Sequence, residues 1–478
     1  MNLTISKKLP IVIVILAAMP VIISGIIAFF QTQSALHVAA FERLSAVQKS
    51  RAHELSGYLY TIHGDLDVLT SSSSVIDALE QFEGAWVEMA AQGTDMTQYL
   101  QKVFISDNPN PIGEKLNLTA ATDGSAYSAV HKKWHPWFTK LLLDRDYFDI
   151  FLLDDKGNVV YSVLKELDYA TNLKTGKWKD SDLAKVGKMV RQNMKLGYTA
   201  FTDYSPYAPS DNVPASFMAM PIFDHQGETH GTLVFQMPVA KINDIMQQSG
   251  GMGESGQSYL VGQDMTMRSD SRFLAKGETS ILSQDVATDS VKKALNGETG
   301  IAIVDNYRGI PVVSAYGALD FLGVTWAVIA EVDDAEVNIP VIELRNEMIV
   351  IILATIAVVS VIGYFFAMSI TKPISAMTGV MGVLANKDWT ADVPSQNRTD
   401  EIGKMASAVQ IFKTNGQEVE RLESEQKANE ARTIQEKRQQ MLDMADDFES
   451  SVGGVVQSVS SASTEMQSSA STLSATAE

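Results

Sequence analysis

The chain has 478 residues, of which 45% are apolar and 20% are charged, and its formal net charge is −19. This composition is that of a folded globular protein and excludes wholesale disorder. So acidic a surface repels phosphate backbones, which argues against nucleic acid as a partner. The chain has no cysteine, which excludes a disulfide framework, thiolate zinc sites and cysteine nucleophiles.

Two apolar segments are long enough to cross a bilayer. The first runs from Leu9 to Phe30 and the second from Met348 to Ile370. About 20 helical residues span a hydrocarbon core of roughly 30 Å. The first run is too long for a signal peptide and lacks an A-x-A-like cleavage site, so it predicts an uncleaved anchor.

The charges beside these segments predict their orientation. Lys7 and Lys8 precede the first segment and Lys372 follows the second, so both chain ends are expected in the cytoplasm. Arg345 lies on the opposite side, but one residue does not reverse the bias. Residues 1–8 are then cytoplasmic, and residues 31–347 lie on the opposite side of the membrane. Two spans around one large external domain favour a receptor over a transporter, which needs more spans.

The external region begins with a predicted helix over 31–70, followed by further helices at about 75–143. β-rich runs separated by turn residues then predict two antiparallel α+β modules, a distal one at about 145–240 and a proximal one at about 250–332. The apolar positions of the first helix are Leu36, Leu44, Val47, Leu55, Leu59, Ile62, Leu66 and Leu69. The β-rich runs lie at 149–162, 215–223, 231–237, 257–268, 299–305, 311–315 and 325–331.

This order of elements resembles a double Cache domain, an extracytoplasmic sensor found in bacterial chemoreceptors. The best-matching segments are the hairpin at 149–162, Ser205-Pro206-Tyr207 with Pro221 after it, and the run 253–262. The resemblance implies an α+β receptor of the bacterial inner (cytoplasmic) membrane, with a long helix along two PAS-like modules. It also implies that a small-molecule ligand binds in the distal module.

The resemblance also suggests where the ligand binds. Amino-acid-binding members carry an aromatic residue, an Arg and a Trp after the first hairpin, and an Asp beyond the Pro-Tyr strand. Lys174 takes the place of the Arg that would hold a carboxylate at two points, which argues against an amino acid ligand. Aromatic and cationic residues suit a small polar solute, although each one singly is also explained as a core aromatic or an exposed loop residue. The expected ligand-binding residues are Tyr169, Lys174, Trp178, Asp203, Tyr204, Tyr207 and Asp211.

Neither a cofactor nor a metal is expected, and no enzymatic site is recognised. The glycine-rich run 251–256 matches the dinucleotide fingerprint as a string, but a strand follows it where the mechanism needs a helix. His131 and His135 share a helical face, yet no carboxylate joins them there. The pair Asp154 and Asp155 is read as hairpin residues and not as a general acid and base.

The segment 371–422 after the second apolar run predicts two short helices joined by a connector at 386–399. Pro373 is expected in the first turn of the first helix. Both helices repeat apolar residues at 3-4-3 spacing, which requires a partner, so a homodimer would form a parallel four-helix bundle. This segment resembles a HAMP domain, although Lys387 stands where the family often has Gly. The residues that carry the resemblance are Pro373, Trp389, Val393 and Glu401.

The last segment, 423–478, is predicted as a coiled coil. Its heptads rich in Ser, Ala and Thr resemble the start of a methyl-accepting signalling helix. The resemblance implies methylation at Glu465 and Glu478, with plain exposed glutamates as the alternative. The hairpin tip with which such receptors bind the chemotaxis histidine kinase and the coupling protein is absent from the sequence.

These observations predict a transmembrane chemoreceptor-type transducer that senses an external small molecule and controls a chemotaxis kinase. A sensor histidine kinase is disfavoured because residues 371–478 contain no His. A nucleotide cyclase with the same sensor is another alternative. A third is a truncated receptor that only binds ligand and pairs with full-length receptors.

Overall fold

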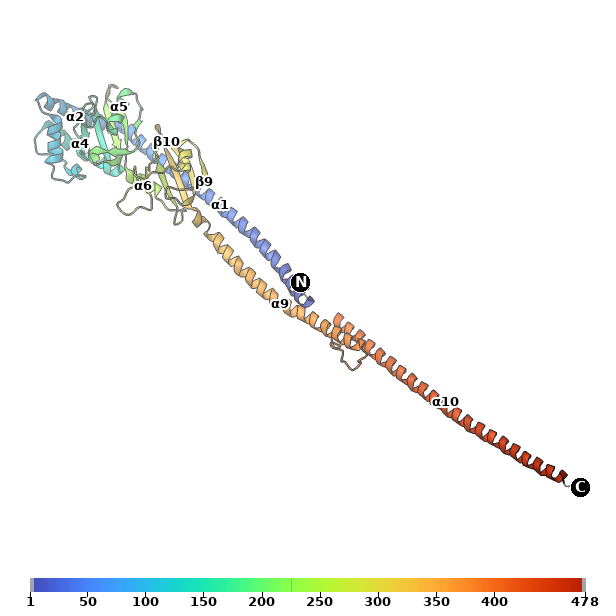
Figure 1. Ribbon diagram of the computed structural model, residues 1–478. Coiled ribbons are helices and arrows are strands. Elements are labelled where there is room, and N and C mark those ends of the chain that lie inside the picture. Colours follow the sequence, from blue (N-terminus) through green and yellow to red (C-terminus); the bar gives the residue numbers. More distant parts are fainter. Residues whose placement is uncertain (1–3, 225, 475–478) are drawn as a thin grey trace. The chain divides into compact units, whose positions relative to one another are not determined.

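The computed structural model describes residues 4–224 and 226–474. It divides into two compact units, which are described separately. One comprises Ile26–Glu347, and the other combines Met1–Gly25 with Met348–Glu478. Figure 1 labels the main elements of both units.

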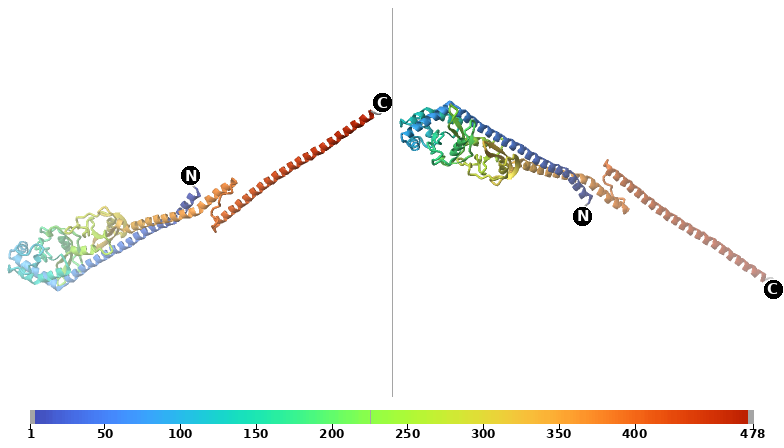
Figure 2. Two further views of the ribbon diagram at one scale, coloured as in Figure 1. Left: turned by 90° about the horizontal axis from the view of Figure 1, so that it is seen from below. Right: turned by 90° about the horizontal axis from the view of Figure 1, so that it is seen from above.

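The first helix, α1 (Ile5–Thr70), joins the predicted anchor and the predicted external helix without a break. Apolar residues recur every three or four positions along it, and those that face the modules are buried from Ala40 onward. Leu55, Leu59 and Leu66 belong to the largest core cluster, which includes residues of the distal sheet. Ala40 and Leu44 pack with strands of the proximal module. The external part of α1 therefore lies along both modules, as both views of Figure 2 show.

A set of helices follows α1 at the start of the distal module. Each begins at a polar side chain that accepts a hydrogen bond from a free backbone N–H: Ser72 for α2, Asp95 for α3 and Ser125 for α4. The chain therefore turns sharply at Ser72 and does not fray there. These elements are α2 (Ser73–Ala91), α3 (Met96–Gln101), the π-helical turn η1 (Lys102–Ser106), the 3-10 turn η2 (Lys115–Asn117) and α4 (Ala126–Arg145).

The distal module contains a five-stranded antiparallel sheet in the order β2-β1-β7-β6-β3. The predicted hairpins form as β1–β2 and β6–β7. A separate two-stranded ribbon pairs β4 with β5, and the 3-10 turn η3 lies between them. The bounds are β1 (Asp149–Asp154), β2 (Val159–Ser162), α5 (Asp182–Gln192), β3 (Ala200–Phe201), β4 (Ser205–Tyr207), η3 (Ala208–Ser210), β5 (Val213–Ala215), β6 (Phe217–Phe223) and β7 (Thr229–Gln236).

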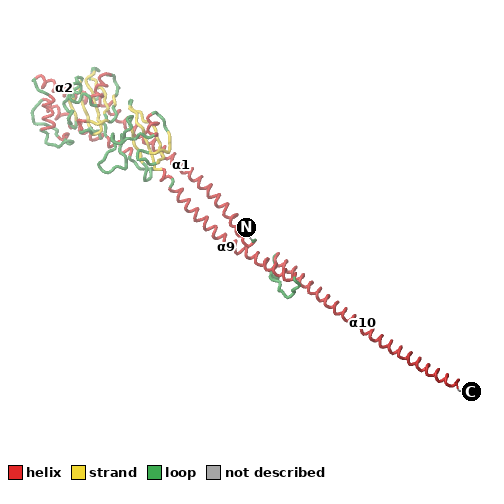
Figure 3. Tube along the Cα trace, viewed as in Figure 1, coloured by secondary structure: helices red, strands yellow, loops and turns green. Residues whose placement is uncertain are grey.

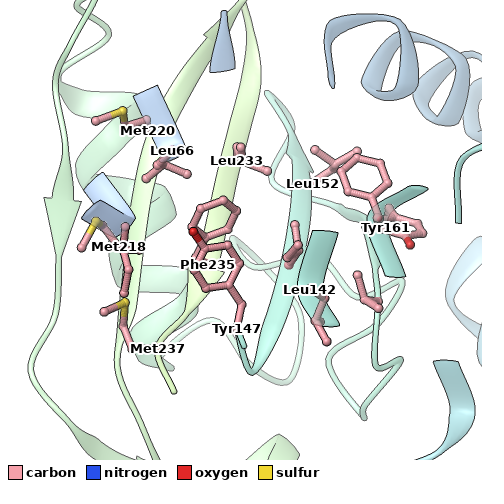
Figure 4. Packing of buried hydrophobic residues seen from close by; sticks show 14 of the residues in the cluster. Leu66, Leu142, Tyr147, Leu152, Tyr161, Met218, Met220, Leu233, Phe235 and Met237 are labelled. Atoms are coloured by element: carbon pink, nitrogen blue, oxygen red, sulfur yellow. The ribbon is translucent and has the colours of Figure 1, made fainter. Parts of the chain in front are cut away.

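Both faces of the distal sheet are buried, because helices cover each of them. On one face Leu66 of α1 lies with Leu233 and Phe235, and Tyr147 stacks on Phe235 with 4.3 Å between ring centroids (Figure 4). On the other face, residues of α5 such as Val186 pack in a second cluster with strand residues. The runs β1 and β6 therefore read as nearly continuous apolar sequence.

The proximal module is a four-stranded antiparallel sheet in the order β8-β11-β10-β9. Strand β10 continues to Phe321, six residues beyond the predicted end of its apolar run at Ala315. Figure 3 shows its strands as a second yellow group beside the distal sheet. The bounds are α6 (Val239–Met246), β8 (Gln257–Val261), α7 (Asp289–Leu295), β9 (Gly300–Asp305), β10 (Pro311–Phe321), β11 (Val324–Asp333) and α8 (Asp334–Val337).

The remaining elements are two long helices, α9 (Ile339–Ala385) and α10 (Glu401–Ser474), joined by the expected connector. The prediction that Pro373 starts a new helix is wrong, because α9 runs through it. Proline lacks the N–H that would bond to the carbonyl of Ser369. Arg398 of the connector donates Nη1 to that carbonyl at 3.5 Å instead.

Two of the described helices, α1 and α9, are long and apolar enough to cross a membrane. Almost none of the most apolar stretch of either helix is buried inside the protein. A core helix of a soluble protein would bury such a stretch. The exposure therefore fits contact with lipid.

Candidate ligand-binding site

The distal module contains a cavity of about 370 Å³. Three separate segments enclose it: the chain between η1 and η2, the loop after β2, and the η3 turn. Its walls are mostly apolar, with a few polar groups among them, which is the usual make-up of a small-molecule site. The lining residues are Ile105, Ile112, Gly113, Lys115, Leu164, Lys165, Glu166, Leu167, Ala208, Pro209, Ser210 and Asp211.

Two lining residues have positive φ angles, which residues with a side chain rarely adopt. Lys165 has φ +54° and Asp211 has φ +56°, and Asn212 next to it has φ +61°. Non-glycine residues with positive φ are uncommon and are held only where the surroundings fix them. Aspartate and asparagine adopt this conformation more readily than other side chains, so the backbone strain lies mainly at Lys165.

Lys165 is fully buried behind the cavity wall. Its Nζ donates to the carbonyls of Val163 at 3.0 Å and Ser162 at 3.2 Å. The Nε2 of His135 lies 2.6 Å from the carbonyl of Leu116 and must donate to it, so Nδ1 accepts from the Tyr161 hydroxyl at 2.7 Å, with Lys165 Nζ 3.3 Å away. Burial lowers the pKa of Lys165 to about 7, although Asp149 acts in the opposite direction. This ammonium group can therefore lose its proton near neutral pH.

Two carboxyl groups of the loop after β2, Glu166 and Asp168, lie near a third, that of Asp149 in β1. Glu166 accepts a hydrogen bond from Ser210, and Asp168 accepts one from Tyr207. Asp149 accepts from backbone N–H groups of the loop after β2, at 2.9 Å from Val163. Burial raises the pKa of all three groups, and that of Asp168 reaches about 7. The bond from Ser210 joins the loop to η3, and the bond from Tyr207 joins it to the end of β4 just before η3, so two walls of the cavity are linked through polar contacts.

The seven ligand residues expected from sequence do not gather around this cavity. Only Asp211 lines it. Tyr169, Tyr204 and Tyr207 are buried in the core. Their role in ligand binding stays a prediction, as does that of the other members of the set.

The remaining expected ligand residues have structural partners of their own. Lys174 is exposed and donates to the carbonyl of Asp155 at 2.7 Å. The indole of Trp178 donates to the carbonyl of Leu167 at 2.9 Å. Asp203 accepts from Arg268 and Trp326 of the proximal module. These contacts hold loops and modules together.

Sequence reasoning missed Lys165, Glu166 and Ser210. Lys165, Glu166 and Asp168 stand close together a few residues after the apolar strand β2, which ends at Ser162. A hairpin strand that ends in charges usually leads into solvent, so the pattern carries no sign that this run turns inward.

The histidine pair of α4 is buried and stacked, with 4.3 Å between ring centroids. Burial lowers the pKa of His131 well below its usual value and that of His135 to about 3. Both rings therefore stay neutral at physiological pH. Within the described residues no group of three His, Asp or Glu side chains is arranged to hold a metal ion.

The residues of the HAMP-like segment surround a small core. Val393 is buried with Met377, Ile402 and Ala406. The ring of Trp389 lies 6.2 Å from that of Phe412, measured between centroids. Glu401 is the exposed first residue of α10. Glu465 is exposed on α10, and Glu478 lies outside the described residues.

The arrangement of these parts defines a sensor of the transmembrane class: a two-module α+β domain between two membrane-capable helices, with a helical relay after the second. The Cache domain family matches residues 31–341, and the HAMP domain family matches residues 365–418. The chain therefore belongs to the Cache domain family, and a HAMP domain follows its sensor.

A curated relative supports the chemoreceptor class. The probable chemoreceptor y4sI of Sinorhizobium fredii (strain NBRC 101917 / NGR234) is 23% identical over 334 residues, which are 69% of this chain and 41% of the relative. The chain thus spans about two fifths of that relative's length. The two domain matches identify a Cache–HAMP sensor, and the relative to which it is similar is a probable chemoreceptor.

Solved ligand-binding domains of chemoreceptors are also similar, at low identity. The domain of Pseudomonas fluorescens CtaA in complex with L-serine is 12% identical, with 54% of this chain and 93% of that chain covered and a TM-score of 0.29. The domain of Pseudomonas aeruginosa PctC with GABA is 18% identical, with 52% and 98% covered and a TM-score of 0.29. The sensory domain of Campylobacter jejuni Tlp1 is 14% identical, with 58% and 98% covered and a TM-score of 0.32.

Proposed function

We propose that this chain is a chemoreceptor-type transducer of a bacterial inner membrane, and that a small molecule bound in the distal cavity is its signal. The observation that carries the proposal is the cavity itself: about 370 Å³, mostly apolar, with a strained backbone at Lys165 in one of its walls. Sites for small ligands have this size and composition. The walls suit a compact solute with an apolar body and at least one polar group.

The first step of signalling is a displacement of η3. Ligand binding favours one arrangement of the cavity walls over the other. The η3 turn belongs to the ribbon β4–β5, which follows Asp203 directly in the chain. Asp203 accepts two hydrogen bonds from Arg268 of the proximal module, so a shift of the ribbon also displaces that module. The proximal strand β11 leads through α8 into α9, the second membrane-capable helix.

The second step takes place in the HAMP domain. A homodimer buries the apolar faces of α9 and α10 in a four-helix bundle, and two packings of similar free energy make it a switch. The helix α10 then controls a chemotaxis histidine kinase through a coupling protein. Methylation of Glu465 and Glu478 would remove negative charge from this helix and so adjust the packing.

The cavity is tested by a thermal-shift screen of the full chain in lipid nanodiscs against a metabolite panel. Compounds that raise the melting temperature are tested again with the variant Ala208→Trp. Ala208 is exposed at the mouth of the cavity, so tryptophan there fills the space without disturbing the core. The control is Ala275→Trp on an exposed loop of the proximal module. Shifts that disappear only with Ala208→Trp support the proposal. A panel without any shift, or shifts that survive Ala208→Trp, would refute it.

A further inference from the structure

The region of α5 and the loop before it is the most basic part of an acidic chain. Residues 174–195 contain seven Lys or Arg and two Asp, whereas the whole chain has a net charge of −19. The basic residues are Lys174, Lys177, Lys179, Lys185, Lys188, Arg191 and Lys195. A local excess of one sign against the overall charge attracts the opposite ion to that place.

Part of this region forms a groove of about 550 Å³ that is separate from the ligand cavity, because the two share no lining residue. Five of its nine lining residues are cationic and one is acidic. Lys185, Lys188 and Arg191 are three residues apart, so they share one face of α5. The lining residues are Leu173, Lys174, Lys179, Asp180, Ser181, Ala184, Lys185, Lys188 and Arg191.

Carboxylates of the chain neutralise only part of this charge. Lys185 lies 3.8 Å from Asp182, and Lys179 lies 3.9 Å from its neighbour Asp180. Exposed pairs of this kind contribute little free energy and leave the lysines available to another anion. Lys188 is exposed and forms no ion pair with any described carboxylate.

Arg191 points more directly to a ligand. Its Nη1 is buried and has no hydrogen-bond partner in the described structure. Gly187 leaves space for the guanidinium, because a Cβ there would lie 3.2 Å from Nη1 and 3.1 Å from Leu153. Burial lowers the pKa of Arg191, and the nearby Asp154 and Asp155 act in the opposite direction without bonding to Nη1. Because Nη1 is buried, an anion in the groove reaches it only after the guanidinium turns outward, and Nη1 then gains the acceptor that it lacks in the free protein.

We propose that this groove is a second ligand site of the distal module, which binds a small anion with two or more carboxylate or phosphate groups. Arg191 donates to one oxyanion group at its end of the groove. Lys188 and Lys185 hold a second group further along α5. A single-charge anion engages only one of these positions and binds more weakly.

The test measures binding of citrate and of pyrophosphate by calorimetry, with the full chain in nanodiscs of neutral lipid at physiological salt. The two probes distinguish carboxylate from phosphate preference, and acetate is the single-charge comparison. The variant is Lys188→Gln with Arg191→Gln. The matched control is Lys292→Gln with Lys293→Gln on α7, which removes the same charge from the other module.

The expected result is saturable binding of at least one of the two probes, weakened about tenfold by the α5 variant and unchanged in the α7 variant. Acetate should bind far more weakly than either. Lys188→Gln alone should weaken binding by a smaller factor. Because Lys188 is exposed, this single variant keeps the test valid if the double variant fails to fold. The absence of saturable binding, or equal weakening by the α7 control, would overturn the proposal.

Discussion

Asp203 of the distal module accepts two hydrogen bonds from Arg268 of the proximal module. Arg268 donates from Nε to Oδ1 at 3.0 Å and from Nη2 to Oδ2 at 2.8 Å. The Arg268 side chain is only 3% exposed, and Trp326 donates its indole N–H to the same carboxylate at 2.7 Å. Gly262 makes room for the guanidinium, because any side chain at that position would occupy its place. This pair is the most direct polar link between the two modules.

Asp203→Ala is expected to destabilise the external domain by roughly 2–3 kcal/mol, because it leaves a buried indole without its acceptor and removes two hydrogen bonds of a buried guanidinium. Asp264, at 2.9 Å, remains as a partner of Arg268 and limits the loss. The melting temperature of the full chain in nanodiscs measures the effect. Asp264→Ala is the control, since its side chain is 53% exposed and its removal should cost less than about 1 kcal/mol. Equal effects of both variants would show that the link between modules lies elsewhere.

Asp168 should make the stability of the protein depend on pH below neutrality. Its pKa is raised to about 7 by burial, with Glu166 adding to the shift and the hydrogen bond from Tyr207 opposing it. The folded state therefore holds this proton more tightly than the unfolded chain, in which an Asp titrates near about 3.9. The free energy of unfolding consequently falls as pH rises from about 4 to 7, by on the order of 3 kcal/mol.

Asp168→Asn keeps the acceptor for Tyr207 but has no proton to lose. Its melting temperature relative to the wild type should therefore rise steadily between about pH 4 and pH 7. The pKa of Lys165 is lowered to about 7, so this lysine acts on stability above that range and does not mask the effect. Asp211→Asn is the exposed control. A difference between Asp168→Asn and wild type that does not change with pH would contradict the prediction.

The sequence predicts the fold largely because the fold depends on periodic patterns. Leu55, Leu59 and Leu66 repeat at helical spacing, and they are the residues that α1 buries. The turn residues between β1 and β2 mark a hairpin in the sequence, and the hairpin forms. The position of Pro373 was less informative, because a proline at the start of a helix and one inside a long helix share the same local sequence.

The candidate site depends on contacts that no local pattern contains. Tyr207 stands in a polar, proline-rich stretch that is typical of binding loops, but its hydroxyl donates to Asp168, 39 residues earlier. A buried tyrosine with a distant partner has the same sequence signal as one that faces a ligand. Lys165 presents the opposite case, because lysine is almost never buried and a sequence gives no reason to expect it inside.

Trp389 of the HAMP connector covers Gly416 of α10 so closely that no side chain fits between them. Gly416→Ala should therefore displace the indole and loosen the connector, although alanine itself favours the helix. Cleavage by trypsin at Lys387 or Arg398 should become faster. Gly382→Ala is the matched control, because its Cβ would meet no atom within 4 Å. Unchanged cleavage of Gly416→Ala relative to this control would show that Trp389 does not hold the connector.

The exposed apolar face of α10 should be buried by a second copy of the chain. Met405 is 49% exposed although it belongs to the same apolar repeat as Ile402, which is buried within the chain. Because the protein has no cysteine, Met405→Cys introduces a single thiol into an otherwise unreactive background. In a parallel homodimer the two copies of this thiol lie near the bundle axis, and mild oxidation should join them.

Ser407→Cys provides the comparison, because residues two positions apart on a helix point in nearly opposite directions. Non-reducing electrophoresis of oxidised membranes should show mostly dimer for Met405→Cys and little for Ser407→Cys. The membranes are also oxidised after the chain has been diluted with excess lipid. Cross-linking by random collision should decrease on dilution, whereas cross-linking within a stable dimer should not. If both variants stay monomeric, or both form equal amounts of dimer, the apolar face of α10 does not pack against a second copy. The HAMP domain could not then switch between two packings of a shared bundle.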